Sequence, residues 1–107
     1  MEDSRIVTDL MFLYGCKEGI VDIVTSYLAS VDNDVNFRIN NNSPSGIWLA
    51  SRYGHEEIVK LLIAHKDIDV NIKSKSNGST PLWIASKNGH VKVVVLLATV
   101  KNIDVNK

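Results

Sequence analysis

The chain has 107 residues, of which 45% are hydrophobic and 22% are charged, so we expect one compact domain rather than a disordered segment. The 12 basic residues balance the 12 acidic ones, and no apolar run reaches the roughly 20 residues that span a bilayer, so neither a nucleic acid nor a membrane is an expected partner. Cys16 is the only cysteine and cannot form an internal disulfide, and the polar residues after Met1 do not resemble a signal peptide, so we expect an intracellular, cytoplasmic protein.

The first unit, about residues 4–38, is expected to contain two helices that meet at Gly19. The first helix carries an apolar stripe whose members are Ile6, Val7, Leu10, Met11, Leu13 and Tyr14. Residues three and four apart share one face of a helix, so the stripe predicts a long helix. We expect it to begin at Asp3 or Ser4, whose side chains can accept a hydrogen bond from a free N–H group. Because its start differs from those of the later units, we interpret this unit as a divergent N-terminal cap that covers the first face of a stack.

The second unit, about residues 43–73, repeats the landmarks of the first unit 35 residues later. The landmarks are the glycines Gly19, Gly54 and Gly89 and the triplets Asp34-Val35-Asn36, Asp69-Val70-Asn71 and Asp104-Val105-Asn106. Two independent landmarks that share one period indicate a repeat architecture. We expect helices near residues 45–53 and 56–64, separated at Gly54 by the positive φ that glycine adopts without steric penalty.

The third unit, about residues 78–107, has the clearest helix signals. Thr80 can cap a helix, and Pro81 has no N–H group for the first turn to leave unpaired, so a helix is expected from there to Gly89. His90 then opens a second helix with one apolar face. Apolar positions match across the units in the sets Ile23, Ile58 and Val93, then Val24, Val59 and Val94, and then Tyr27, Leu62 and Leu97. The polar stretch before this unit, His65–Ser79, contains the tight-turn signal Asn77-Gly78 and should project as a turn or hairpin finger.

The last helix lacks the features of a capping helix. It is apolar through most of Val91–Val100, and Val95 stands where the preceding unit has the charged Lys60. Terminal repeats of a stack need polar outer faces, because no neighbour covers them. We therefore expect either a fragment of a longer array or an uncapped, apolar C-terminal face that another chain covers, for example in a homodimer.

One segment of the third unit reads Ser79-Thr80-Pro81-Leu82-Trp83-Ile84-Ala85, and Asn88-Gly89-His90 follows it. This pattern resembles the signature of the ankyrin repeat family, and the resemblance extends over roughly residues 10–107. It implies an all-α fold, a solenoid of three helix-turn-helix repeats with projecting fingers. It also implies a protein that binds other proteins.

The chain departs from the family's pattern in two respects. Its period is about two residues longer, which predicts longer fingers around residues 66–68 and 73–77, since loops tolerate insertions. Trp48 and Trp83 stand where the family usually has a histidine that bonds neighbouring repeats. The two indoles can pack between helices or form an exposed aromatic strip, and packing is the commoner fate of so large a side chain.

The resemblance implies a concave binding surface, formed by the finger tips and the exposed side of each first helix. Position by position, the candidate partner-binding residues are Lys17, Glu18, Asn41, Asn42, Pro44, Arg52, Tyr53, Ser76, Asn77, Ser79, Lys87 and Asn88. Lys17, Arg52 and Lys87 are themselves 35 residues apart, so stacking would align them in a basic row. We expect the row to meet acidic side chains of a partner, with Tyr53 as an anchor. The alternative is that these are ordinary solvated residues near helix C-termini, where positive charge is mildly favourable.

No catalytic, cofactor or metal site is expected from the sequence. His55 and His90 occur once per repeat, and stacking would hold them roughly 10 Å apart, too far to share a zinc ion. Cys16 has no base at a recognisable spacing, and Asp32-Asn33-Asp34 lacks the glycine and glutamate of a calcium loop.

The sequence therefore predicts a non-catalytic protein-protein interaction module, an adaptor or scaffold that binds a partner protein on its concave face. Two alternatives remain open at this point. The stack can be a structural spacer or self-association unit, or it can be a recognition fragment of a larger regulatory or enzymatic protein.

Overall fold

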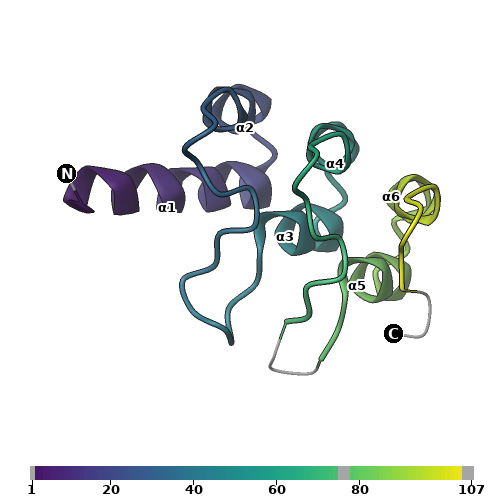
Figure 1. Cartoon of the computed structure of the whole chain (residues 1–107). Helices are drawn as coiled ribbons and strands as arrows, with labels where there is room; N and C mark the ends of the chain where they lie inside the picture. The colour runs from purple at the N-terminus through teal and green to yellow at the C-terminus, as the bar shows by residue number, and fades with distance from the viewer. Residues whose placement is uncertain (1, 75–77, 105–107) are drawn as a thin grey trace.

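In the computed structural model, residues 2–74 and 78–104 are described, and they form six α-helices (Figure 1). The helices are α1 (Glu2–Glu18), α2 (Val21–Leu28), α3 (Gly46–Arg52), α4 (Glu56–Ile63), α5 (Pro81–Lys87) and α6 (Val91–Ala98). A tight turn joins the two helices of each pair, and a longer loop leads from one pair to the next.

The helices lie in two rows. α1, α3 and α5 pack side by side in one row, α2, α4 and α6 form the second row, and each odd-numbered helix also packs against its own partner. The stack measures 40 × 25 × 23 Å, and the loops after α2 and α4 project beyond the first row (Figure 1). The predicted all-α solenoid of three helix-turn-helix units is confirmed.

The predicted helix starts and ends in the second and third repeats are confirmed. The Oγ of Ser45 accepts a hydrogen bond from the Trp48 N–H group at 3.3 Å, and the Thr80 hydroxyl caps α5 in the same way. After the first helix of each pair, the glycine takes a φ of 74° to 78°, the left-handed conformation that favours glycine. His55 and His90 then occupy the N-cap positions of α4 and α6.

The core follows the 35-residue register. Tyr27, Leu62 and Leu97 are one repeat apart, and all three are buried between the rows. Burying such apolar side chains is the main favourable term in folding, at roughly 1.5–3 kcal/mol each. Because each repeat covers the same positions of the next, one buried face continues through the whole stack.

The Asp-Val-Asn triplets link consecutive repeats. The valine of each described triplet enters the core, and Val35 and Val70 are both 2% exposed. The Asn36 Nδ2 group donates to the carbonyl of Asp67 at 2.8 Å, and its Oδ1 accepts from the N–H group of Asp69 at 2.8 Å. Asn71 makes the same pair of bonds to Asn102 and Asp104. In the third triplet, Val105 and Asn106 lie outside the described residues.

The first helix corrects two expectations. It begins at Glu2, so Asp3 and Ser4 lie inside the helix and not at the position before its first residue. Of the predicted stripe, Leu13 alone is buried, and the other members, Ile6, Val7, Leu10, Met11 and Tyr14, are 41% to 59% exposed. The buried side of α1 instead carries Asp9, Phe12, Leu13 and Cys16. Apolar residues lie on nearly every side of this helix, so their periodicity does not determine which side faces the core.

The second finger closes as a short hairpin. Ser74 and Ser79 pair as an isolated antiparallel bridge, in which the Ser74 N–H group donates to the Ser79 carbonyl at 2.8 Å. Gly78 has a φ of 68°, as expected for the glycine of a tight turn, while Asn77 lies outside the described residues.

Candidate functional site

Two histidines contact the backbone of the predicted basic row, each from the repeat that follows. The Nε2 atom of His55 lies 2.7 Å from the Lys17 carbonyl oxygen, and that of His90 lies 2.8 Å from the Arg52 carbonyl oxygen. A carbonyl oxygen only accepts hydrogen bonds, so Nε2 is the protonated ring nitrogen in both contacts. The contacts fix Lys17 and Arg52 in equivalent places of adjacent repeats.

Aromatic rings lie under two cations of the row. The Arg52 guanidinium carbon is 5.8 Å from the centroid of the Trp48 ring and 5.4 Å from that of the Tyr53 ring, and the Lys87 Nζ is 5.2 Å from the Trp83 centroid. Distances below about 6 Å allow cation–π attraction. These contacts restrict the Arg52 and Lys87 side chains while both residues remain exposed.

The basic row has no acidic partner within the described part of the chain. The only ion pair found there joins Lys66 to Asp67, away from the row. Lys17, Arg52 and Lys87 therefore present positive charge to the solvent, and Tyr53 beside them is 42% exposed. Such a combination of cations and an exposed tyrosine suits recognition of an acidic surface.

The other candidate residues divide between two places. Glu18 and Asn88 lie beside the row, where Asn88 Nδ2 donates to the Arg52 carbonyl at 3.1 Å. Asn41, Asn42 and Pro44 belong to the first finger, which precedes α3, whereas Arg52 and Tyr53 follow it. The seven residues of α3 span roughly 10 Å, so the two groups lie at opposite ends of this helix.

Of the three remaining candidate finger residues, the structure describes only Ser79, and it is buried. Ser79 is 1% exposed, and its carbonyl and hydroxyl both accept from the Trp48 Nε1 at 3.2 Å, so it serves the interior of the stack. Ser76 and Asn77 lie outside the described residues.

The two tryptophans have different surroundings. Trp48 is 7% exposed and bonds to Ser79 in the next repeat, so it packs between repeats and supplies the inter-repeat bond expected of the family's histidine. Trp83 is half-buried, and its backbone N–H group bonds to the Thr80 cap. The sequence did not determine whether the two tryptophans are packed or exposed. In the structure Trp48 is packed between repeats, and Trp83 is partly exposed.

A model of ankyrin repeats, in three copies, matches residues 12–107. The chain belongs to the ankyrin repeat family. No curated protein matches the sequence of the chain. Ankyrin repeats are generally protein-protein interaction modules and are typically non-catalytic.

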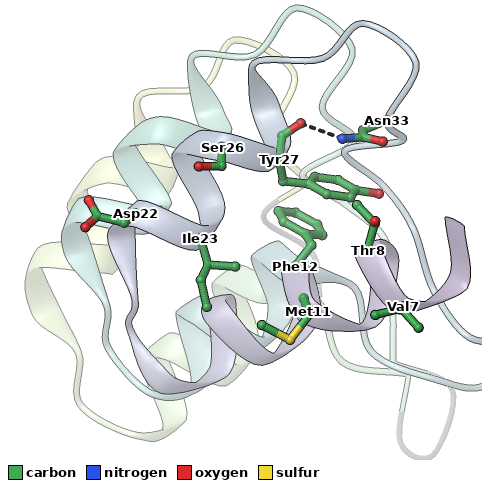
Figure 2. A pocket seen from close by; sticks show the side chains of 9 residues that line it. All are labelled: Val7, Thr8, Met11, Phe12, Asp22, Ile23, Ser26, Tyr27 and Asn33. Carbon is green, nitrogen blue, oxygen red and sulfur yellow. Dashed lines mark hydrogen bonds between the residues drawn. The ribbon is translucent and has the colours of Figure 1, made fainter. Parts of the chain in front are cut away.

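At the N-terminal end of the ankyrin stack, a groove of about 410 Å³ lies between α1 and α2 (Figure 2). The rings of Phe12 and Tyr27 stack at its centre, with centroids 4.0 Å apart, and Val7, Met11 and Ile23 flank them. None of the partner-binding residues predicted from the sequence lines this groove. The signal that could have revealed it is the surplus of apolar residues on α1.

Cys16 is a free cysteine that is buried in the first repeat of the ankyrin stack. Burial raises the pKa of the Cys16 thiol to about 12, so this cysteine is protonated at neutral pH and unreactive. Residues 2–74 and 78–104 contain no cluster of three His, Cys, Asp or Glu side chains that could bind a metal ion. Within the same residues, no helix combines the length and the hydropathy needed to cross a membrane.

Proposed function

We propose that this ankyrin repeat protein is a non-catalytic adaptor that binds an acidic segment of a partner protein along the row Lys17, Arg52 and Lys87. Tyr53 lies next to Arg52 and anchors the segment. The observation that carries the proposal is the Arg52 guanidinium, which lies within 6 Å of two aromatic centroids and has no carboxylate partner among the described residues.

The dimensions of the row suggest the shape of the partner segment. Packed helices lie roughly 8–10 Å apart, and an extended chain advances roughly 3.3 Å per residue. An extended segment with an acidic side chain at about every third residue would therefore match Lys17, Arg52 and Lys87 in turn. The first finger, with exposed Asn41 and Asn42, supplies further polar contacts.

The proposal is tested by capturing partners with the full chain, identifying them by mass spectrometry and measuring the affinity of each by calorimetry. Arg52→Ala combined with Tyr53→Ala should weaken binding by roughly 30-fold or more, since truncated hot-spot residues lose about 2 kcal/mol or more. Affinity should also fall as salt is raised, because exposed charges are screened.

A matched control comes from the opposite row. Glu57 and Lys60 are exposed on α4, so Glu57→Ala combined with Lys60→Ala removes two charged side chains outside the proposed surface. This variant should bind like the native chain. Equal losses in the two double variants would contradict the proposal.

A structural role is the second candidate, and the exposed apolar residues at the two ends of the stack favour it. Val7 and Met11 on α1 are 59% and 46% exposed, and Val91 on α6 is 68% exposed. If the stack is mainly a spacer or self-association unit, changes at these ends should affect assembly while changes in the basic row leave it intact.

A further inference from the structure

One side of α1 is exposed at the N-terminal end of the stack. We call it the end face, and its members follow one another at helical spacing: Val7, Met11, Tyr14 and Glu18. The three apolar members are 46% to 59% exposed. Val7 and Met11 also line the groove between α1 and α2, above the buried rings of Phe12 and Tyr27. An apolar surface therefore continues from the groove along α1.

Two carboxylates lie at one end of this apolar surface. Glu18 is the last residue of α1, and Asp22 lies in the first turn of α2, at the edge of the groove beyond Ile23 (Figure 2). Both acidic residues are exposed, and neither forms an ion pair within residues 2–74 and 78–104. The surface thus combines an apolar stripe with unpaired negative charge at one end.

The end face is not shaped to receive a preceding ankyrin repeat. In the second repeat, a Cβ atom on Gly46 would lie 2.9 Å from the Cys16 Sγ of the repeat before it, whereas the equivalent residue of α1 is the much larger Met11. The Asp32 carbonyl accepts from the Arg5 guanidinium at 3.0 Å, whereas the carbonyl 35 residues later accepts from the preceding repeat. The end face therefore suits a partner of another kind.

Pairing with the α1 helix of a second copy does not satisfy the charge of the end face. In an antiparallel pair, Glu18 and Asp22 would meet the first turns of the other α1, where Ser4 continues the end face and Arg5 is bonded to the loop after α2. In a parallel pair the carboxylates would face each other, and like charges repel. A matching partner has to supply a cation of its own.

We propose that the end face and the adjoining groove bind an amphipathic helix of another protein. Apolar side chains at positions i, i+4 and i+7 of that helix pack on the three apolar residues of the end face, and one of them enters the groove. A lysine or arginine in the next turn pairs with Glu18 and Asp22. Because Val7 and Glu18 are 11 residues apart, or roughly 16 Å along α1, the bound helix has about three turns. This surface is separate from the basic row, so the inference goes beyond the proposed function.

The probe for this surface is a phage-displayed library of alanine-based helical peptides of about 15 residues, randomised along one side. Peptides selected on the 107-residue chain should share apolar residues at i, i+4 and i+7 and a lysine or arginine in the next turn. Fluorescence anisotropy then measures the affinity of the strongest peptide. Replacing its basic residue with glutamate should weaken binding by roughly tenfold, because a like charge then meets Glu18 and Asp22.

Val7→Glu and Val95→Glu form a matched pair of variants. Both valines are 59% exposed, one on the end face and the other on α6 at the opposite end of the stack, so both variants should fold. Val7→Glu should weaken binding of the basic peptide by roughly tenfold, because the new charge is buried against apolar side chains in the complex. Val95→Glu should bind this peptide like the native chain.

A charge reversal separates the docking role from an effect on folding. In Glu18→Arg combined with Asp22→Arg, the preference should reverse, so that the glutamate peptide binds more tightly than the basic one. A loss of stability would weaken both peptides alike and would not reverse their order.

Three results would overturn the proposal. In the first, no peptide is selected, or the selected peptides bind Val7→Glu and Val95→Glu equally well. In the second, the selected peptides are acidic and lose affinity in Arg52→Ala combined with Tyr53→Ala, which would support the proposed function alone. In the third, the 107-residue chain forms concentration-dependent assemblies in sedimentation experiments that Val7→Glu abolishes, which would make a second copy the occupant.

Discussion

Tyr27→Phe tests how the first repeat tolerates a buried carboxylate. The Tyr27 hydroxyl donates to Asp9 Oδ1 at 2.6 Å and also lies 3.0 Å from the Asp34 carbonyl, while Asp9 is 6% exposed. Phenylalanine keeps the stacking on Phe12, where the ring planes are 10° apart, so the substitution removes the hydroxyl alone.

The two partners of this bond should respond unequally. Hydrogen bonds to charged groups contribute roughly 1.5–3 kcal/mol, and a buried charge left without its partner adds a desolvation penalty. We therefore expect Tyr27→Phe to lower the free energy of unfolding by about 3 kcal/mol. Asp9→Ala should lower it by only about 1 kcal/mol, because the Tyr27 hydroxyl can still donate to the Asp34 carbonyl.

Urea denaturation at neutral pH, followed by circular dichroism, measures both values. The double variant should be more stable than Tyr27→Phe alone, because removing Asp9 also removes the stranded carboxylate. If Asp9→Ala proves as harmful as Tyr27→Phe, or the double variant is the least stable of the three, the reasoning about the buried charge is wrong.

Three further predictions concern stability. Asn36→Ala should lower the free energy of unfolding, measured by urea denaturation, by about 1–2 kcal/mol, because it removes two hydrogen bonds to the next repeat. No change would show that water replaces these hydrogen bonds fully. Ser51→Ala should leave the free energy of unfolding unchanged or raise it by up to about 1 kcal/mol in the same assay, since the buried Ser51 hydroxyl has no hydrogen-bond partner among the described residues. A clear loss of stability would point to such a partner. The free energy of unfolding should fall as pH rises from 9 toward 12, because the unfolded chain releases the Cys16 proton that the folded chain retains. Melting temperatures measured across this pH range should fall less in Cys16→Ala than in the native chain. An equal fall in both would exclude Cys16 as the cause.

The regular parts of the fold could be predicted because the sequence repeats them. Thr80 and Pro81 start a helix, and Gly54 ends one, through interactions within a few residues of themselves. Such local rules operate in any surroundings, and repetition at a 35-residue spacing supported each of them independently.

The first helix could not be predicted as well, because its sequence lacks those local signals. Five of the six residues of the predicted apolar stripe are exposed, since Phe12 and Cys16 pack against α3 and turn the stripe outward. Which side of an apolar helix is buried depends on the neighbour that it meets, and that neighbour lies more than 25 residues away.

The sequence by itself determined the family, the number of repeats and the positions of the turns, because these follow from local backbone preferences and from repetition. Only the tertiary structure decided that Ser79 is an internal acceptor for Trp48, that Arg52 lies against two rings and that His90 bonds to the Arg52 carbonyl. Each of these facts depends on atoms from segments brought together by stacking, and a linear pattern does not contain the distance between them.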